Sequence, residues 1–151
     1  MSVWIHVFIF ITTFFMMEFM AWFTHKYIMH GFLWYLHKDH HKKDHEHWWE
    51  RNDTFFIFYA VISMSFIMLW NNGILAIGVG IGFGIMAYGL AYFLVHDVFI
   101  HQRIKWFRNA NNRYAKAIRR AHKMHHKHTG KEDGECFGML WVPWKYFKNA
   151  R

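Results

Sequence analysis

Three long apolar stretches dominate the chain. The first covers residues 3–23 and is interrupted only by His6 and Glu18, the second covers about 54–70, and the third covers about 73–95 without a charged residue. A helix needs roughly 20 apolar residues to cross the hydrocarbon core of a bilayer, so each stretch predicts a membrane span, the second with help from its flanks. The short polar turn Trp-Asn-Asn-Gly between the last two predicts a tight helical hairpin.

Positive charge separates the two ends of these spans. All 18 Lys and Arg residues lie in residues 26–51 and 103–151, whereas the N-terminal dipeptide and the hairpin turn carry none. By the positive-inside rule, both basic segments are expected in the cytoplasm and the N-terminus outside. The predicted fold is therefore all-α: a single domain, residues 1–151, with three spans and a helical cap on the cytoplasmic side.

The composition also indicates a membrane protein. The chain has 151 residues, of which 54% are hydrophobic and 22% aromatic, and its net charge is +8. A soluble core of this size could not bury so much aromatic surface, so lipid is the expected second solvent. The lone Cys136 excludes an internal disulfide. The long N-terminal apolar run lacks a basic region before it, so a retained anchor is expected rather than a cleaved signal peptide.

The third apolar stretch contains regularly spaced glycines. On a helix, Gly78, Gly82 and Gly89 form one stripe, and Gly80 and Gly84 form another that is nearly opposite. Small residues let membrane helices approach closely, so this helix is expected to be central and packed on both sides. The alternative is a smooth groove for a long apolar substrate, lined by Gly80 and Gly84.

Histidines repeat in a pattern that is HX4H followed by HX2HH, and this pattern occurs twice. Its ten members are His25, His30, His37, His40, His41, His96, His101, His122, His125 and His126. In HX2HH the three imidazoles fall on one face of a helix and can converge. In HX4H the two residues diverge by about 140° on a regular helix, so they can share a site only where the helix ends or is distorted, or where an ion lies between its flanks.

Convergence of these histidines requires the chain to turn twice. Glycine commonly ends a helix, so the first span is expected to stop near Gly31 and HKDHH to fold back. Further on, the sequence RNANNR predicts a break near residues 109–112, with a helix out and a helix back that bring His122 close to His101. The first five and the last five histidines would then form the two halves of one site at the cytoplasmic membrane edge.

Ten imidazoles are too many for one ion, but two ions with about five each fit. Neutral imidazole binds iron, zinc, copper and nickel. No cysteine belongs to the pattern and no HExxH is present, so a thiolate-rich zinc site or a zincin protease is not expected. An all-imidazole pair beside a lipid-facing pocket indicates a non-haem di-iron centre that activates oxygen, with zinc possible in a purified sample. The other histidines, assigned to interfaces or solvent, are His6, His45, His47 and His128.

The motifs HKYIMHG, HDVFIHQR and FGMLWVP carry a family resemblance. Over about residues 18–143 the chain resembles the fatty acid hydroxylase and sterol desaturase superfamily of membrane di-iron enzymes, and within it the bacterial carotene hydroxylases. The resemblance implies hydroxylation of β-carotene at carbon 3 of its β-ionone rings, giving β-cryptoxanthin and zeaxanthin. It also implies two iron ions, O2, a ferredoxin-type electron donor and a bacterial inner membrane.

Several residues outside the histidine pattern have candidate roles. Asp97 could accept an imidazole N–H and fix its tautomer, or it could pair with Arg103 or Lys105. Glu18, an acid within a span, could hydrogen-bond a helix partner or line the substrate pocket. Asp39 has no counterpart in HKMHH, so the chemistry is not expected to require it. The tail CFGMLWVPWKYF is expected to lie on the membrane interface or to cover the site.

Other functions remain open at this point. A hydroxylase, ketolase or desaturase acting on a fatty acid or sterol would use the same chemistry, whereas a histidine-rich metal transporter should place its ligands near the bilayer midplane. The basic segment 103–131 is expected to contact anionic lipid headgroups or an acidic electron donor. Nucleic acid is not an expected partner.

Overall fold

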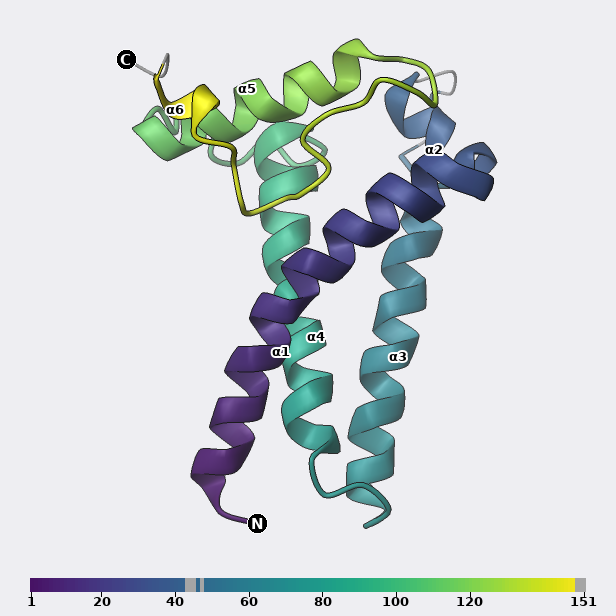
Figure 1. Cartoon of the computed structure of the whole chain (residues 1–151), viewed down its shortest axis with the longest axis vertical. Helices are drawn as coiled ribbons and strands as arrows, with labels where there is room; N and C mark the ends of the chain where they lie inside the picture. The colour runs from purple at the N-terminus through teal and green to yellow at the C-terminus, as the bar shows by residue number, and fades with distance from the viewer. Residues whose placement is uncertain (43–45, 47, 149–151) are drawn as a thin grey trace.

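A computed structural model describes residues 1–42, 46 and 48–148, and all regular structure in this part of the chain is helical (Figure 1). Three helical runs are long and apolar enough to cross a membrane: Val3–Phe32, Asp53–Asn71 and Gly78–Ile100. They stand side by side, and the remaining helices lie across one end as a cap (Figure 1). The all-α fold and the three spans are therefore as predicted.

The third span extends further than predicted at the end that carries the cap, whereas the first span ends at Phe32, next to the predicted stop at Gly31. Helix α1 (Val3–Phe23) continues without interruption into the π-helix η1 (Thr24–Phe32), and α4 (Gly78–Phe93) continues into the π-helix η2 (Leu94–Ile100). The apolar pattern breaks off earlier because the π-helical ends carry histidines. The histidines therefore lie on extensions of the spans themselves.

The hairpin turn differs from the prediction, because the third span begins at Gly78 and not at Gly73. Gly73 has φ +70 and ends α3 (Asp53–Asn71): its N–H donates to the Trp70 carbonyl, and the Ile74 N–H donates to the Leu69 carbonyl, each at 2.9 Å. This pair of bonds closes a helix C-terminus around a left-handed residue, a conformation that glycine adopts without a steric penalty. Residues 72–77 therefore belong to the turn.

Helix α4 is central, and its two glycine stripes face different neighbours. A Cβ atom at Gly84 would lie 2.9 Å from the carbonyl oxygen of Phe10 in α1, and one at Gly82 would lie 2.8 Å from the carbonyl oxygen of Ser63 in α3. Gly80 meets α1 in the same way as Gly84. Helices α1 and α3 thus pack on opposite sides of α4, as the stripes predict.

The cap consists of α2 (Trp34–His41), α5 (Arg113–Lys127) and α6 (Lys145–Lys148). Helix α5 starts at the predicted break, where the Asn112 side chain accepts the Ala115 N–H at 2.8 Å. The predicted outward helix is absent, since residues 101–112 are irregular throughout and include left-handed backbone at Gln102 and Phe107. Only the returning half of the expected helix pair forms.

A non-helical segment, residues 128–142, leads from the end of α5 to α6, and we call it the strap. The strap, drawn in yellow-green, runs below α5 in the view of Figure 1. Met139 and Val142 of the strap are buried. The first part of the predicted tail therefore covers the interior of the cap.

Candidate metal centre

The two HX4H pairs lie on the two π-helical extensions. In η2 the His101 N–H donates to the His96 carbonyl at 2.9 Å, and at the end of η1 the Leu33 N–H donates to the Ile28 carbonyl at 3.0 Å. Hydrogen bonds between residues i and i+5 widen the helix and bring residues five apart toward one face. A distorted helix is one of the three arrangements that the HX4H spacing allowed.

The predicted turn at Gly31 is present as a kink with φ −95 and ψ −126, and α2 follows it. The fold-back brings the HX2HH motif of α2 against η1. The Nε2 atoms of His25 and His37 are 3.1 Å apart, and those of His30 and His41 are 3.2 Å apart.

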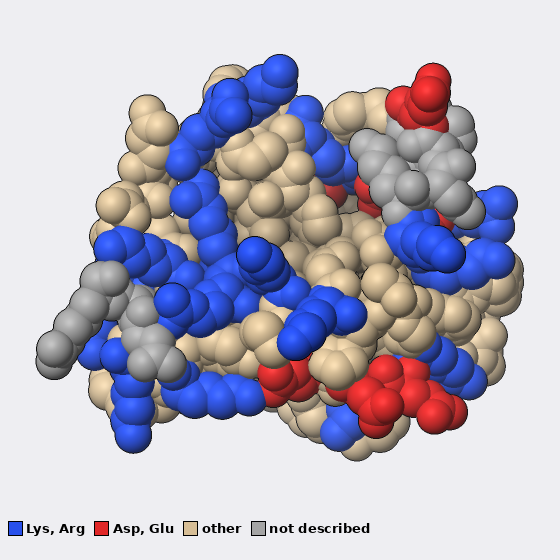
Figure 2. Space-filling view, turned by 90° about the horizontal axis from the view of Figure 1, so that it is seen from above, with Lys and Arg blue, Asp and Glu red and all other residues tan. Residues whose placement is uncertain are grey.

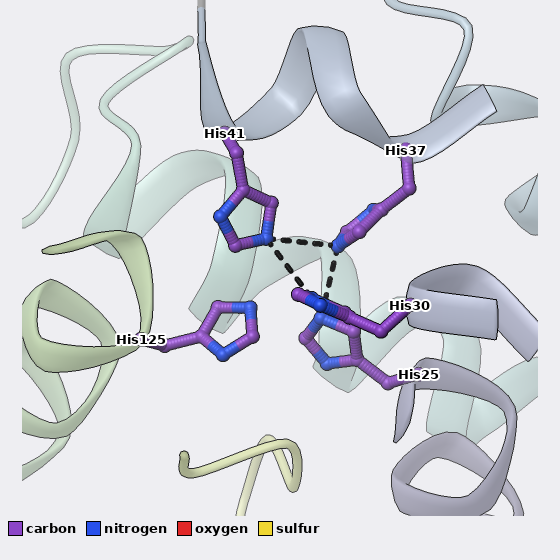
Figure 3. A group of neighbouring side chains, drawn as sticks. All are labelled: His25, His30, His37, His41 and His125. Atoms are coloured by element: carbon purple, nitrogen blue, oxygen red, sulfur yellow. Dashed lines mark hydrogen bonds between the residues drawn. The ribbon is translucent and has the colours of Figure 1, made fainter. Parts of the chain in front are cut away.

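Nine of the ten patterned histidines form two groups, within each of which the facing nitrogen atoms lie within 4.8 Å of one another. The first group is His25, His30, His37, His41 and His125, and the second group is His40, His101, His122 and His126. Figure 3 shows the five rings of the first group pointing from η1, α2 and α5 toward a common space. Most of these histidines are buried.

The grouping corrects the predicted division into the first and last five histidines, because His40 and His125 are exchanged. Within each HX2HH motif, the residues at i and i+4 face one group, and the residue at i+3 reaches the other. The angle between positions i+3 and i+4 on a helix is about 100°, so neighbouring imidazoles diverge when two groups lie side by side. The two groups are thereby interlocked.

His96 lies beside the second group without belonging to it. Its ring centroid is 4.5 Å from that of His101 and 4.6 Å from that of His40. Its Nδ1 atom is 3.1 Å from a carboxylate oxygen of Asp97. The structure therefore places all ten predicted histidines in one cluster, with His96 at its edge.

Hydrogen bonds on the outer side of the rings fix their tautomers. In the first group, Nδ1 of His25 lies 2.9 Å from the Phe137 carbonyl, and Nδ1 of His125 lies 2.9 Å from the Glu135 carbonyl. A carbonyl oxygen can only accept, so Nδ1 must be the donor and carry the proton. The Nε2 lone pairs of these neutral rings then point into the cluster.

Such inward lone pairs repel one another unless a cation lies among them. The dashed Nε2–Nε2 contacts of Figure 3 could be hydrogen bonds only if one ring were doubly protonated. Burial, and then the neighbouring His41, lowers the pKa of His125 to about 2, and burial lowers the pKa of His126 to about 3. Since protons are disfavoured, a metal cation is the charge that fits this donor set.

Nitrogen atoms without a hydrogen-bond partner also indicate a metal site. Nε2 of His40, His125 and His126 is buried and has no hydrogen-bond partner among the described residues. A buried polar atom without a partner is costly, and nearly all such atoms in folded proteins are satisfied. Both groups contribute to this set of nitrogens, so both have the chemistry to hold a metal ion.

The loop before α3 supplies two contacts that the sequence pattern did not indicate. Nδ1 of His37 donates to the Asn52 side-chain oxygen at 2.7 Å, and Nδ1 of His40 donates to the Glu50 carboxylate at 2.8 Å. Asp39 accepts the Arg51 N–H at 2.7 Å and so holds this loop against α2. The available signal was a cluster of polar residues directly before an apolar span.

Asp97 makes both contacts that were left open for it. One carboxylate oxygen lies 3.1 Å from Nδ1 of His96, and the other accepts from the Arg103 guanidinium at 2.6 Å. Arg103 also donates to both carboxylate oxygens of Asp53 at 2.8 Å, and it lies over the Trp48 ring with its guanidinium carbon 4.6 Å from the centroid. This network ties the end of η2 to the start of α3.

A cavity of about 360 Å³ lies between the three spans, directly beside the first group. Its wall is largely apolar and aromatic, and His25 forms part of it. Representative lining residues are Met17, Ala21, Thr24, Phe56, Tyr59, Ile85, Tyr88 and Tyr92. The hydroxyl groups of Thr24 and Tyr59 are 2.5 Å apart and link η1 to α3 across the cavity. Such a volume and lining suit an apolar ligand.

Glu18, Gly80 and Gly84, the predicted pocket residues, do not line this cavity. The space beside the two glycines is occupied by α1, as described above. Glu18 accepts the Tyr88 hydroxyl at 2.7 Å, and its carboxylate also accepts backbone N–H groups of the strap. The three N–H donors, at 2.8–3.0 Å, belong to Met139, Leu140 and Trp141. Glu18 therefore anchors the strap to α1 and α4.

Two of the four unpatterned histidines can be placed. His6 lies in α1, where its carbonyl oxygen contacts Gly80. The His128 carbonyl accepts from Nδ1 of His41 at 3.2 Å, so its backbone supports the first group. His45 and His47 lie outside the described residues.

Comparison with known proteins shows the family of the chain. The sequence profile of the family described as fatty acid hydroxylase matches residues 10–149. The chain belongs to the fatty acid hydroxylase family. This membership confirms the superfamily resemblance that the motifs predict, and it makes the chain an oxygenase. No solved structure matches this family member.

Relatives of this fatty acid hydroxylase family member include β-carotene hydroxylases of bacteria and plants. It is 40% identical over 127 residues to the β-carotene hydroxylase of Pantoea ananas, covering 84% of this chain and 71% of the relative. It is 36% identical to the β-carotene hydroxylase of a Paracoccus species, covering 88% of this chain and 82% of the relative. A chloroplastic β-carotene 3-hydroxylase of Arabidopsis thaliana is also 36% identical, but this chain covers 42% of it.

Proposed function

We propose that the chain is a membrane β-carotene hydroxylase that hydroxylates carbon 3 of the β-ionone rings, giving β-cryptoxanthin and then zeaxanthin. The observation that carries the proposal is the cavity whose wall includes His25, because an apolar ligand held there lies directly beside the first histidine group. The names of the bacterial relatives support the choice of substrate.

The proposed cofactor is a pair of non-haem iron ions, one in each histidine group. Iron held by neutral imidazoles supplies the activation of O2. One oxygen atom then enters the ring C–H bond and the other leaves as water, which consumes two electrons and two protons. We propose a ferredoxin-type donor for the electrons.

The chain itself holds the substrate and shields the reaction from water. The aromatic walls of the cavity bury the ring, and the strap closes the first group from the side of the cap. The outer hydrogen bonds keep the five imidazoles of the first group, and His40 of the second, in the Nδ1–H tautomer, so that their Nε2 atoms stay available as ligands. These contacts pre-organise the site before substrate binds.

We place the cap in the cytoplasm of a bacterial cell, with the spans in the inner membrane. The N-terminus and the hairpin turn lie at the opposite end from the cap (Figure 1). Lys and Arg residues gather on the outer surface of the cap (Figure 2). Exposed basic residues of α5 are Arg113, Arg120, Lys123 and Lys127. This surface suits anionic lipid headgroups and an acidic electron donor.

Expression in bacteria that accumulate β-carotene tests the proposal. We expect β-cryptoxanthin and zeaxanthin to appear with the wild-type chain and neither to appear with His122→Ala, as measured by chromatography of the pigments. An expressed, iron-loaded wild-type chain that leaves β-carotene unchanged would refute the carotenoid substrate and favour a fatty acid or sterol. The position of the histidines at the ends of the spans, away from the midplane, does not favour a metal transporter.

A further inference from the structure

The outer contacts of the first histidine group are all made to uncharged oxygen atoms. Four of its Nδ1 atoms donate to backbone carbonyls of the strap, and the fifth, in His37, donates to the amide oxygen of Asn52 at 2.7 Å. The four carbonyls belong to His128, Lys131, Glu135 and Phe137, at 2.9–3.2 Å. Within the part of the chain that the structure describes, no carboxylate is hydrogen-bonded to Nδ1 of a ring of this group.

The second group is backed differently. Nδ1 of His40 donates to the carboxylate of Glu50 at 2.8 Å, and both residues are largely shielded from solvent. His96, at the edge of the same group, has its Nδ1 atom 3.1 Å from the Asp97 carboxylate. Among the described residues, a carboxylate thus lies behind His40 of the second group and another behind His96 at its edge, whereas the contacts behind the first group are made by uncharged oxygens.

The short loop before α3 makes both kinds of contact. Glu50 and Asn52 are two residues apart and back one histidine of each group. The loop is held by Asp39, which accepts the Arg51 N–H at 2.7 Å, and by Asp53, which accepts the Glu50 N–H at 3.0 Å. A rigid loop of this kind can support the two groups independently, because its two side chains point to different rings.

We propose that the two histidine groups hold electronically unequal metal ions, and that Glu50 is the positioning residue that makes them unequal. A carboxylate behind an imidazole raises the basicity of the opposite nitrogen, so the ring becomes a stronger ligand. The ion in the second group is bound more tightly per ligand and is oxidised more readily than the ion in the first. The inference rests on the two-ion centre of the proposed function, but it does not depend on the substrate.

Glu50→Gln separates the charge of the carboxylate from its hydrogen bond. Glutamine keeps an acceptor oxygen for Nδ1 of His40, so a purely orienting role predicts no change. The detergent-purified protein would be stripped of metal and titrated with Co²⁺ in competition with a chelator, with absorption spectra as a second readout. We expect one of the two ions to bind about 10- to 100-fold more weakly than in the wild type, and the other to be unaffected.

Asn52→Asp is the reciprocal variant, because it places a carboxylate behind His37 of the first group. We expect it to tighten the ion that Glu50→Gln leaves unaffected. Ligand variants assign the ions: the effect of Glu50→Gln should persist when His25, of the first group, is changed to Ala, and it should vanish when His122, of the second group, is changed to Ala.

The outcomes separate this inference from the proposed function. If the wild type binds two ions and Glu50→Gln weakens both equally or neither, the inequality is refuted while the two-ion centre stands. If the wild type binds fewer than two ions under saturating Co²⁺, the two-ion centre fails and the inference fails with it. Loss of carotenoid hydroxylation alone, with the two affinities as expected, would refute the proposed substrate only.

Discussion

At the scale of single residues, the site depends on which nitrogen of each imidazole carries its proton. The strap carbonyls and the loop side chains select the Nδ1–H tautomer, and the inward Nε2 atoms are left as ligands. Replacing a histidine that contributes such a nitrogen should therefore affect metal binding, whereas replacing a nearby histidine that contributes only its backbone carbonyl should not.

His125→Ala should abolish both metal binding by the first group and formation of zeaxanthin, because its unpartnered Nε2 atom faces that group. His40→Ala should have the same effect on the second group. His128→Ala is the matched control, since His41 uses only the carbonyl of that residue. Metal content per chain and pigment analysis measure these effects. A His125→Ala protein with normal metal content would contradict the ligand assignment.

The pH dependence of the metal-free protein follows from the depressed pKa values. Burial, then the neighbouring His30, lowers the pKa of His41 to about 4, and the pKa of His126 lies at about 3. The unfolded chain takes up these protons near pH 6.5, so below that value it binds more protons than the folded chain. The stability of the metal-free protein should therefore fall as the pH falls from about 6.5 toward 4. Thermal unfolding in detergent across this range checks the trend, and a constant melting temperature would contradict it.

At the scale of elements, α4 and the strap hold the site together. Helix α4 packs against both other spans through its glycines, and the strap is fastened to the spans at Glu18. Each attachment can be tested with a variant that changes little else.

Gly84→Ala should destabilise the packing of α1 on α4, whereas Gly89→Ala should not. The new Cβ atom at Gly84 would lie 2.9 Å from the backbone oxygen of Phe10, but at Gly89 its nearest neighbour is a ring atom of Phe56 at 3.7 Å. Overpacking of this kind costs about 1–3 kcal/mol. Thermal unfolding of the two variants in the same detergent provides the measurement. Equal melting temperatures would show that α1 and α4 accommodate the added methyl group without a loss of stability.

Glu18→Gln should loosen the strap and weaken metal binding in the first group more than in the second. The carboxylate accepts three strap N–H groups, and the strap carbonyls in turn orient four rings of the first group. Metal content and protease cleavage within the strap report the effect. Glu132→Gln, at an exposed position of the same strap, is the control. Equal metal retention by both variants would indicate that Glu18 has only a packing role.

The helical elements were largely predictable, but their interlocking was not. Hydropathy located the spans, and the HX4H spacing allowed a helix distortion as one of three arrangements, which the two π-helices provide. The exchange of His40 and His125 depends on how α2 and α5 lie relative to each other, and no local pattern encodes that relation. Glu50 and Asn52 escaped notice because they lie on an irregular loop, where periodicity carries no information. The start of α4 was misplaced because apolar turn residues resemble a helix in hydropathy.

At the scale of the whole molecule, the basic surface of the cap faces away from the spans (Figure 2). Electron transfer from the proposed acidic donor protein should therefore weaken as salt rises, because screening shortens the range of charge attraction to about 8 Å at physiological ionic strength. A small uncharged reductant should support turnover that is insensitive to salt. Turnover rates with the two reductants at several salt concentrations make the comparison. The same salt response with both would exclude electrostatic docking.

A reversal of charge tests the same surface more locally. Arg120→Glu and Lys123→Glu change exposed positions of α5, whereas the neighbouring His122 is buried in the second group. We expect slower turnover with the protein donor and unchanged turnover with the small reductant. Unchanged turnover with both reductants would place the docking site elsewhere.

The contribution of His125 and the strap to the first group also sets an order for biosynthesis. The ligands His25 and His30 leave the ribosome about one hundred residues before His125 and before the carbonyls that orient them. The spans must therefore enter the membrane and pack before the first group is complete. An ion in the first group would therefore meet its full set of ligands only late in maturation, and it would connect an early part of the chain with a late one. With the proposed iron as that ion, cells short of iron should accumulate inserted chains whose first group is incomplete.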